Sequence, residues 1–203
     1  EISQSVRHVK TGQLVLLVGG GTWREQIVAP ASDFLPLPEL ENLNDKLIEQ
    51  LSMSIVNPVT AFLMLTSFTQ LKEGQWLVQS AANSAVGGYV IQLARQRGVK
   101  TVNVVRRSGL ADDLIAKGGD VVLIDGPDLA AKIKRATDDA PIQLAFDAVG
   151  GDTFGRLANS LNNDGTLIAY GVLSGRPANL NTAITIFKDI RIRGFWLSKW
   201  YEK

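Results

Sequence analysis

The segment of residues 77–106 reads LVQSAANSAVGGYVIQLARQRGVKTVNVVR, and the rest of the chain is best interpreted outward from it. An apolar run at Trp76–Val78 leads into a turn of small residues at Ala81–Gly88. Apolar residues then recur every three or four positions as far as Gly98, and a second apolar, β-branched run follows at Thr101–Val105. The pattern changes from strand to helix to strand within about 30 residues, which is the length of one βαβ unit.

The turn of small residues lies where a dinucleotide-binding fold has its phosphate loop, between the first strand and the first helix. Such loops follow GxGxxG, because the glycines allow a tight reversal, close approach of backbone N–H groups to a pyrophosphate, and close packing of helix on strand. Here the three positions hold Ala82, Ser84 and Gly87. This motif is weak by itself, since many turns that bind no nucleotide share it. The flanking strand and helix strengthen the interpretation.

The residue that indicates the cofactor is Arg106, 19 positions after Gly87 (106 − 87 = 19). Enzymes that use NAD carry Asp or Glu near this position, which accepts hydrogen bonds from the ribose 2′-hydroxyl. This chain presents Arg106, Arg107 and Ser108 instead, and a guanidinium binds a 2′-phosphate through paired charge-assisted hydrogen bonds. We therefore predict NADPH rather than NADH. The alternative is that the two arginines are only solvated side chains at the edge of the sheet.

Composition excludes several functions. The 203 residues are 45% hydrophobic, enough for one full core. A net charge of +1 gives no sign of binding to nucleic acid or to an anionic membrane. With no cysteine and one histidine, His8, the chain cannot form a disulfide or a zinc site of Cys and His. No apolar run reaches transmembrane length, no basic-then-apolar leader is present, and the first residue is Glu1, so we expect a fragment of a longer protein.

The first part of the chain does not resemble a complete domain. Strands are expected at Leu14–Val18 and Trp23–Ala29, on either side of a glycine hinge at Gly19–Gly21, and prolines interrupt the residues that follow. A helix is expected near residues 44–51. So few strands are not stable alone, and we expect them to be the edge of a β structure completed elsewhere. Trp23 is a candidate for lining a substrate cleft, although local packing is the favoured interpretation.

The remainder alternates between strands and helices. A helix is predicted to begin at Asn57 and Pro58, a favourable N-cap and first-turn pair, and to run to Leu71. Strands are expected near residues 76–80, 100–105, 120–124, 142–147, 164–170 and 190–196, and helices near 86–97, 109–117, 127–137, 152–161 and, more weakly, 181–187. Six apolar runs separated by helices predict an α/β fold with a Rossmann-type, doubly wound parallel sheet.

Residues that follow the strands are candidates for the site, because ligands of such sheets bind outside the carboxyl ends of the strands. Gly150–Gly151 follow the fourth strand and either admit a cofactor closely or make a simple turn. The fifth strand ends in Tyr170–Leu173, and the sixth contains Gly194–Leu197. The aromatic side chains in these segments are of the kind that brackets a nicotinamide ring. The pattern alone, however, favours a place in the core for Phe195 and Trp196.

Six motifs, in their order along the chain, resemble the medium-chain dehydrogenase/reductase superfamily. They are VNPVTAFLML (56–65), QSAANSAVG (79–87), VNVVRRS (102–108), DAVGG (147–151), IAYGVL (168–173) and FKDIRIRGFWLSKW (187–200). Within the superfamily the chain is most similar to the zinc-free mitochondrial-type trans-2-enoyl-CoA (enoyl thioester) reductases. The ANSxVG loop and the RGFWLSKW block are fairly specific to them, whereas the other motifs are shared with the zinc-free quinone oxidoreductases.

The resemblance implies an activity and a set of cofactor contacts. The activity is the NADPH-dependent reduction of the double bond of trans-2-enoyl thioesters, with a hydride added at the β-carbon and a proton at the α-carbon. No catalytic residue is assigned in this chain, because the family's proton-donating tyrosine belongs to the missing amino-terminal portion. Helix capping alone would explain one of the implied contacts, Asn57. The residues implied to contact NADPH are Asn57, Asn83, Ser84, Ala85, Val86, Arg106, Arg107, Ser108, Tyr170, Gly171, Val172, Leu173, Phe195, Trp196 and Leu197.

The resemblance also implies a domain organisation and partners. Residues 1–50 would be a remnant of a GroES-like β-barrel with a linker, and residues 51–203 the NADPH-binding domain. The partner would be a small acyl thioester, with no nucleic acid and no membrane, in a homodimer formed through the last strand. The compartment would be the cytoplasm, or the mitochondrial matrix in a eukaryote. Two alternatives stay open: an NADPH:quinone oxidoreductase of the zinc-free class, and a non-catalytic NADPH-binding module.

Overall fold

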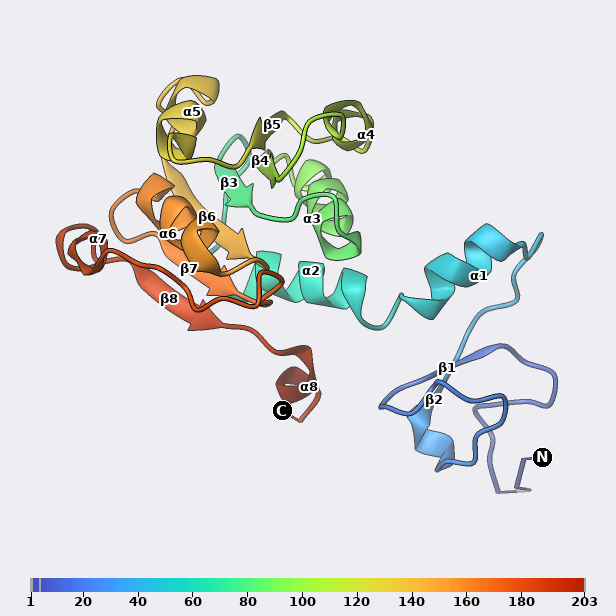
Figure 1. Cartoon of the computed structure of the whole chain (residues 1–203). Coiled ribbons are helices and arrows are strands. Elements are labelled where there is room, and N and C mark those ends of the chain that lie inside the picture. The colour runs from blue at the N-terminus through green and yellow to red at the C-terminus, as the bar shows by residue number, and fades with distance from the viewer. Residues whose placement is uncertain (1, 4, 203) are drawn as a thin grey trace. The chain divides into compact units, whose positions relative to one another are not determined.

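The computed structural model describes residues 2–3 and 5–202 of the chain, which divides into two compact units at Val56 and Asn57 (Figure 1). The predicted boundary, at residue 50, lies six residues earlier (56 − 50 = 6). Among the described residues no single helix is long and apolar enough to cross a membrane. Only two consecutive helices taken together, α1 (Asp45–Ser52) and α2 (Asn57–Ser67), reach the length and composition that a span would need.

The first unit contains little regular structure. Strands β1 (Val15–Leu17) and β2 (Phe34–Pro36) pair antiparallel, and a short 3-10 turn, η1 (Ala31–Asp33), precedes β2. Helix α1 begins after Asn44, whose side chain accepts a hydrogen bond from the Leu47 N–H at 3.0 Å. No hydrophobic side chain among the described residues of this unit is fully buried.

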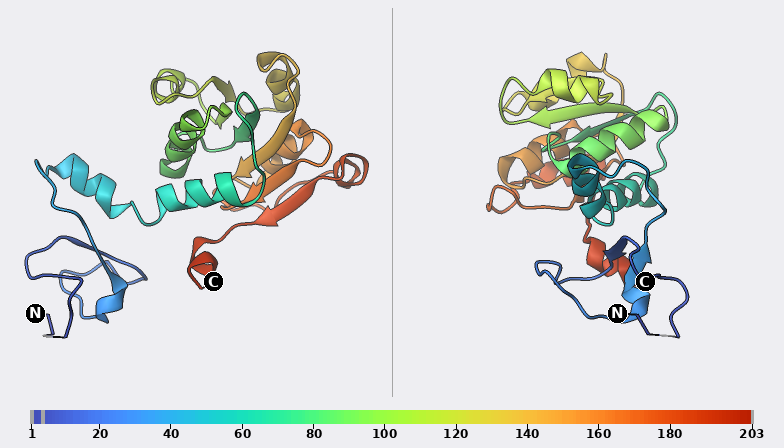
Figure 2. Two further views of the ribbon diagram at one scale, coloured as in Figure 1. Left: turned by 180° about the vertical axis from the view of Figure 1, so that it is seen from behind. Right: turned by 90° about the vertical axis from the view of Figure 1, so that its right-hand side faces the viewer.

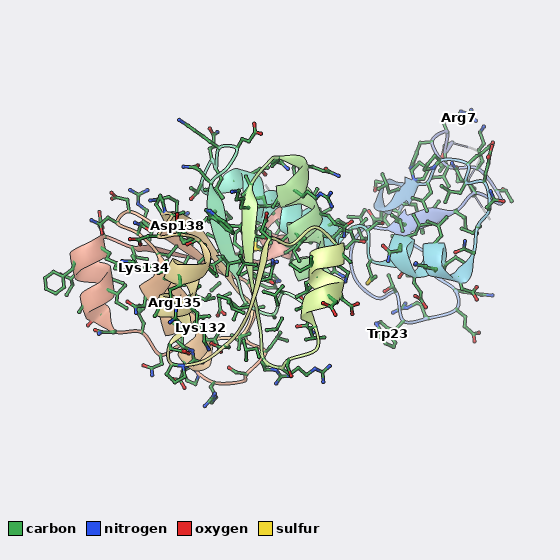
Figure 3. All side chains as sticks on the ribbon, turned by 90° about the horizontal axis from the view of Figure 1, so that it is seen from above. Arg7, Trp23, Lys132, Lys134, Arg135 and Asp138 are labelled. Carbon is green, nitrogen blue, oxygen red and sulfur yellow. The ribbon has the colours of Figure 1, made fainter. Side chains whose placement is uncertain are left out.

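The strand predicted at Trp23–Ala29 is wrong, because these residues are irregular and β1 pairs instead with the more apolar β2. The favoured local packing of Trp23 is also wrong, since its side chain is fully exposed (Figure 3). The cluster Trp23, Arg24 and Glu25 interrupts the apolar pattern that a half-buried strand would need.

Six strands of the second unit form one parallel sheet, so the predicted Rossmann-type sheet is confirmed. The order across the sheet is β5-β4-β3-β6-β7-β8. It reverses between β3 and β6, and ligands of doubly wound sheets bind at such a switch point. The strands are β3 (Trp76–Gln79), β4 (Lys100–Val105), β5 (Val121–Ile124), β6 (Ile142–Asp147), β7 (Thr166–Ala169) and β8 (Arg191–Gly194).

Helices cover both faces of this sheet, as Figures 1 and 2 show. Successive strand residues point to opposite faces, so Leu77 is buried on the side of α2 and α3, whereas Val78 is buried on the side of α5 and α6. Helix α2 ends at Ser67, four residues before the predicted end at Leu71 (71 − 67 = 4), and the short α8 was not predicted. The remaining helices are α3 (Ala85–Gln96), α4 (Ala111–Ala116), α5 (Leu129–Ala136), α6 (Gly151–Ser160), α7 (Thr182–Lys188) and α8 (Leu197–Tyr201).

Helix α5 illustrates how the sequence pattern produces this layering. Leu129 and Ile133, four residues apart, are buried against the sheet. Lys132, Lys134 and Arg135 belong to the same helix (Figure 3) and carry its charge. Apolar residues at this spacing, with charged residues at the positions around them, are the pattern of a helix that covers one face of a core.

Candidate functional site

The loop between β3 and α3 has the geometry that the phosphate-loop motif requires. The Ser84 side chain caps α3 by accepting a hydrogen bond from the Gly87 N–H at 3.1 Å. Ala82, within the loop, is fully buried. A Cβ atom at Gly87 would lie 2.5 Å from the Ala82 carbonyl oxygen, so only glycine allows helix and loop to approach this closely. The first N–H groups of a helix lack intrahelical partners, which makes this end of α3 suitable for an anion.

A buried polar network holds α3 against the strands. The Gln79 amide nitrogen donates to the Gly87 carbonyl at 3.1 Å and to Asn103 Oδ1 at 2.8 Å. Asn103 in turn donates to Thr101 Oγ1 at 2.9 Å and to the Val121 carbonyl at 3.1 Å. Sequence analysis missed this network. Its signal was the presence of single polar residues, Gln79 and Asn103, inside otherwise apolar strands.

At the switch point, the ends of β3 and β6 are joined by Ser80 and Asp147. The Ser80 hydroxyl donates to Asp147 Oδ1 at 2.7 Å and accepts from the Ala148 N–H at 3.0 Å. The carboxylate also accepts from the N–H groups of Val149 and Gly150, at 3.2 and 2.8 Å. Both side chains are buried, and burial raises the pKa of Asp147 against the opposing effect of these hydrogen bonds. The network fixes the loops that follow β3 and β6 relative to each other.

The loop after β7 runs along the loop after β6. The N–H groups of Tyr170 and Leu173 donate to the carbonyls of Asp147 and Ala148, each at 2.9 Å. A Cβ atom at Gly171 would lie 2.9 Å from the Ala148 carbonyl oxygen, so glycine permits this approach. The segment Tyr170–Leu173 is thereby held beside the switch point, with the side chains of Val172 and Leu173 exposed.

Tyr170 and Ser84 come together at this place, although they are 86 residues apart in the sequence (170 − 84 = 86). The Tyr170 hydroxyl is buried and has no hydrogen-bond partner of acceptable geometry. Burial raises the pKa of Tyr170 to about 12, and the Ser84 hydroxyl close by opposes that shift. A buried polar atom without a partner is uncommon and suggests a place for a ligand group.

Arg106, Arg107 and Ser108 follow β4 at the same rim of the sheet and are exposed. Asp125, which directly follows the neighbouring strand β5, lies next to them, because its N–H donates to the Val105 carbonyl at 2.9 Å. The rim at these strand ends therefore carries both cationic side chains and a carboxylate.

The Asp125 carboxylate is bound by two side chains from α6. Arg156 donates from Nε to Oδ1 and from Nη2 to Oδ2, each at 2.8 Å, and Thr153 donates from Oγ1 to Oδ2 at 2.6 Å. Burial alone would raise the pKa of Asp125, but the hydrogen bonds from Arg156 and Thr153 lower it overall. Sequence analysis did not single out these three residues.

The segment Phe195–Leu197 divides between core and surface. Phe195 is buried, as expected, with its ring 6.3 Å from that of Phe68 and 5.7 Å from that of Trp200. The favoured core position of Trp196 is wrong, because its side chain is 64% exposed. The reason is the extended backbone at Trp196, which turns consecutive side chains to opposite sides just before α8 begins at Leu197.

The other predicted residues are placed as follows. Asn57 is the first residue of α2 and is partly buried, so the helix begins one position earlier than an N-cap at Asn57 would imply. Asn83 is exposed in the loop before α3, Ala85 is exposed in the first turn of that helix, and Val86 is partly buried there. The loop, the start of α3 and the ends of β4, β6 and β7 thus lie along one rim of the sheet.

A family model described as "Zinc-binding dehydrogenase" matches residues 85–203. Among curated proteins, the chain is 38% identical over 188 residues to the mitochondrial enoyl-[acyl-carrier-protein] reductase of Dictyostelium discoideum, covering 90% of this chain and 52% of that protein. It is 37% identical over 207 residues to the protein of the same name from Caenorhabditis elegans, covering 99% of this chain and 58% of that protein. The chain therefore spans about half the length of the curated relatives it matches.

Solved structures agree with this similarity. A complex of Etr1p with NADP and crotonyl-CoA has a TM-score of 0.89 and 28% identity, and the match covers 100% of this chain and 61% of that one. The mitochondrial 2-enoyl thioester reductase Etr1p/Etr2p heterodimer from Candida tropicalis has the same score, identity and coverage. An Escherichia coli quinone oxidoreductase in complex with NADPH has a TM-score of 0.84 over 98% of this chain and 61% of that one, and its 23% identity supports the fold alone.

Zinc, which the family description names, does not fit the residues of this chain. The sequence has no cysteine and one histidine. In the part of the chain that the structure describes, no group of three or more His, Asp or Glu side chains is placed to hold a metal ion.

Proposed function

The chain belongs to the zinc-binding dehydrogenase family of the medium-chain dehydrogenase/reductase superfamily, and we propose that it supplies the NADPH-binding domain of a zinc-independent 2-enoyl thioester reductase. The activity would be reduction of the double bond of trans-2-enoyl thioesters. The similarity to mitochondrial enoyl-[acyl-carrier-protein] reductases over nearly the whole chain supports this choice of substrate.

The observation that carries the proposal is the convergence of Ser84, Tyr170 and Asp147 at the switch point of the sheet, with Arg106 at the end of the next strand. The residues present fit NADPH. The capped start of α3 suits a pyrophosphate, Arg106 and Arg107 suit a 2′-phosphate, and the orphaned Tyr170 hydroxyl offers a partner to a polar group in the crevice.

The chain's own contribution would be binding and orientation. When bound, the cofactor supplies a hydride for the β-carbon of the enoyl group. The loop Tyr170–Leu173, fixed by its hydrogen bonds to the loop after β6, would hold the nicotinamide end in place. We propose that NADPH is also contacted by Asn57 and by the segment Phe195–Leu197. Within that segment Trp196 is the exposed side chain, whereas Phe195 is held in the core.

We further propose that the protein forms a homodimer through the edge of the sheet at β8. Ile192 on this strand is exposed, as are Ile186 and Phe187 on α7, which precedes it. An edge strand with exposed apolar residues favours pairing with another copy. Phe195, which follows β8, is not proposed as part of this contact, because its ring packs against Phe68 inside the unit. In a eukaryote the location would be the mitochondrial matrix, as the names of the relatives suggest. Residues 1–50 would correspond to part of a GroES-like barrel with its linker.

Steady-state kinetics of the full-length protein would test the substrate. We expect NADPH-dependent turnover of crotonyl-CoA with a higher kcat/KM than for a small quinone. A preference for the quinone would favour an NADPH:quinone oxidoreductase, a class with a structural neighbour at 25% identity and a TM-score of 0.72. Binding of NADPH without turnover of either substrate would favour a non-catalytic module.

A further inference from the structure

Asp125 and Arg106 are the residues that directly follow two neighbouring strands of the sheet, β5 and β4. Val105 pairs with Ile124 in the parallel register of β4 and β5, and the hydrogen bond from the Asp125 N–H to the Val105 carbonyl extends this pairing by one residue. Arg106 thus has a carboxylate-bearing residue as its direct neighbour across the strands. An uncompensated carboxylate at this place would attract a guanidinium beside it and repel a phosphate.

Arg156 compensates that carboxylate. Its two-point contact, at 2.8 Å to each oxygen of Asp125, is the paired geometry in which guanidinium and carboxylate bind most strongly. The side chains of Asp125 and Arg156 are only 13% and 26% exposed, so solvent screens the pair less than it would at the surface. Thr153 occupies a further acceptor position on the same carboxylate.

We propose that Arg156 is a positioning residue for cofactor specificity: by neutralising Asp125 it leaves Arg106 free to bind the 2′-phosphate of NADPH. This inference rests on the proposed function, because it assumes that the 2′-phosphate lies at the end of β4. Loss of Arg156 would expose a carboxylate that both repels the phosphate and competes for Arg106. NADH carries a hydroxyl at the same position, so its binding would change little.

The test compares variants of the full-length protein by calorimetric titration with NADPH, NADH and 2′,5′-ADP, a fragment that carries the phosphate without the nicotinamide. In Arg156→Met we expect Kd to rise about tenfold for NADPH and for 2′,5′-ADP. For NADH we expect a change of less than about twofold. The double variant Asp125→Asn/Arg156→Met removes the carboxylate as well and should regain most of the NADPH affinity.

A role of Arg156 in packing alone predicts different results. The inference would be overturned if Arg156→Met lost as much affinity for NADH as for NADPH, or if the double variant did not regain affinity for NADPH. Should Arg156→Met fail to fold, Asp125→Asn alone decides: a Kd for NADPH equal to or below that of the wild type supports the inference, and a weaker affinity contradicts it. A wild-type protein without preference for NADPH would refute the proposed cofactor as well, whereas a preference that Arg156→Met leaves intact would refute this inference alone.

Discussion

The Ser80 hydroxyl donates a hydrogen bond to the Asp147 carboxylate at 2.7 Å, and this bond joins the two strands between which the order of the sheet reverses. In Ser80→Ala the buried carboxylate loses a donor, and the Ala148 N–H loses its acceptor. We expect a loss of about 1–3 kcal/mol in the free energy of unfolding, because buried polar groups without partners are costly. Urea denaturation would measure it. The exposed Ser198→Ala should change stability by less than about 0.5 kcal/mol, and equal effects of the two substitutions would contradict the account.

The adjacent glycines of α3 provide a matched pair of substitutions. In Gly87→Ala the new methyl group would meet the Ala82 backbone at 2.5 Å, so helix or loop must shift, and we expect a loss of about 1–3 kcal/mol. In Gly88→Ala the nearest atoms belong to the flexible Lys117 side chain, at 3.8 Å, and alanine should stabilise the helix by up to about 1 kcal/mol. Thermal unfolding of both variants would check this. If the change in stability had the same sign in both variants, the close approach at Gly87 would not be required.

Replacement of Arg106 by alanine should weaken the binding of NADPH far more than the binding of NADH. A charge-assisted contact to the 2′-phosphate contributes on the order of 2 kcal/mol, or roughly thirtyfold in Kd. Fluorescence titration of the full-length protein with each cofactor would measure the ratio of affinities. An equal loss for the two cofactors would remove the argument for recognition of the 2′-phosphate at this position.

The pH dependence of stability should reveal the buried hydroxyl of Tyr170. Its pKa is raised from 10.0 to about 12, so the folded state favours the neutral phenol. The stabilising contribution of the neutral Tyr170 hydroxyl to the free energy of unfolding is fully present below pH 10. It is lost as the pH rises towards 12, because the tyrosine of the unfolded chain ionises at a lower pH than that of the folded protein. The free energy of unfolding of Tyr170→Phe should therefore fall less between pH 9 and pH 11 than that of the wild type. If the free energy of unfolding of the two proteins changed in parallel with pH, the Tyr170 hydroxyl would have to be exposed to solvent, and the prediction would be wrong.

The fold could be predicted from sequence because the inner strands of the parallel sheet, β3, β4, β6 and β7, are largely apolar runs buried on both faces, and the helices between strands have their own periodicity. The exceptions lie where the pattern is mixed or short. Trp23–Ala29 contains charges among apolar residues and forms no strand, and the five residues of α8 are too few to show a period. The exposure of Trp196 depends on the path of the backbone after β8, which no local pattern encodes.

The candidate site was predictable only where a motif fixes the chemistry. The small-residue loop and Arg106 have such motifs, and their positions follow directly from the strand before each of them. The contacts between Ser80 and Asp147 and between Asp125 and Arg156 join residues 67 and 31 positions apart. These pairs meet only because of the strand order and because α6 packs near the end of β5, and neither is visible in a single sequence.

The most direct test of the central claim is a crystal structure of the full-length protein with NADPH. The account predicts that the pyrophosphate lies at the start of α3 beside Ser84, and that the 2′-phosphate lies within hydrogen-bonding distance of Arg106. A cofactor bound elsewhere than at the switch point, or a 2′-phosphate turned away from Arg106, would contradict it.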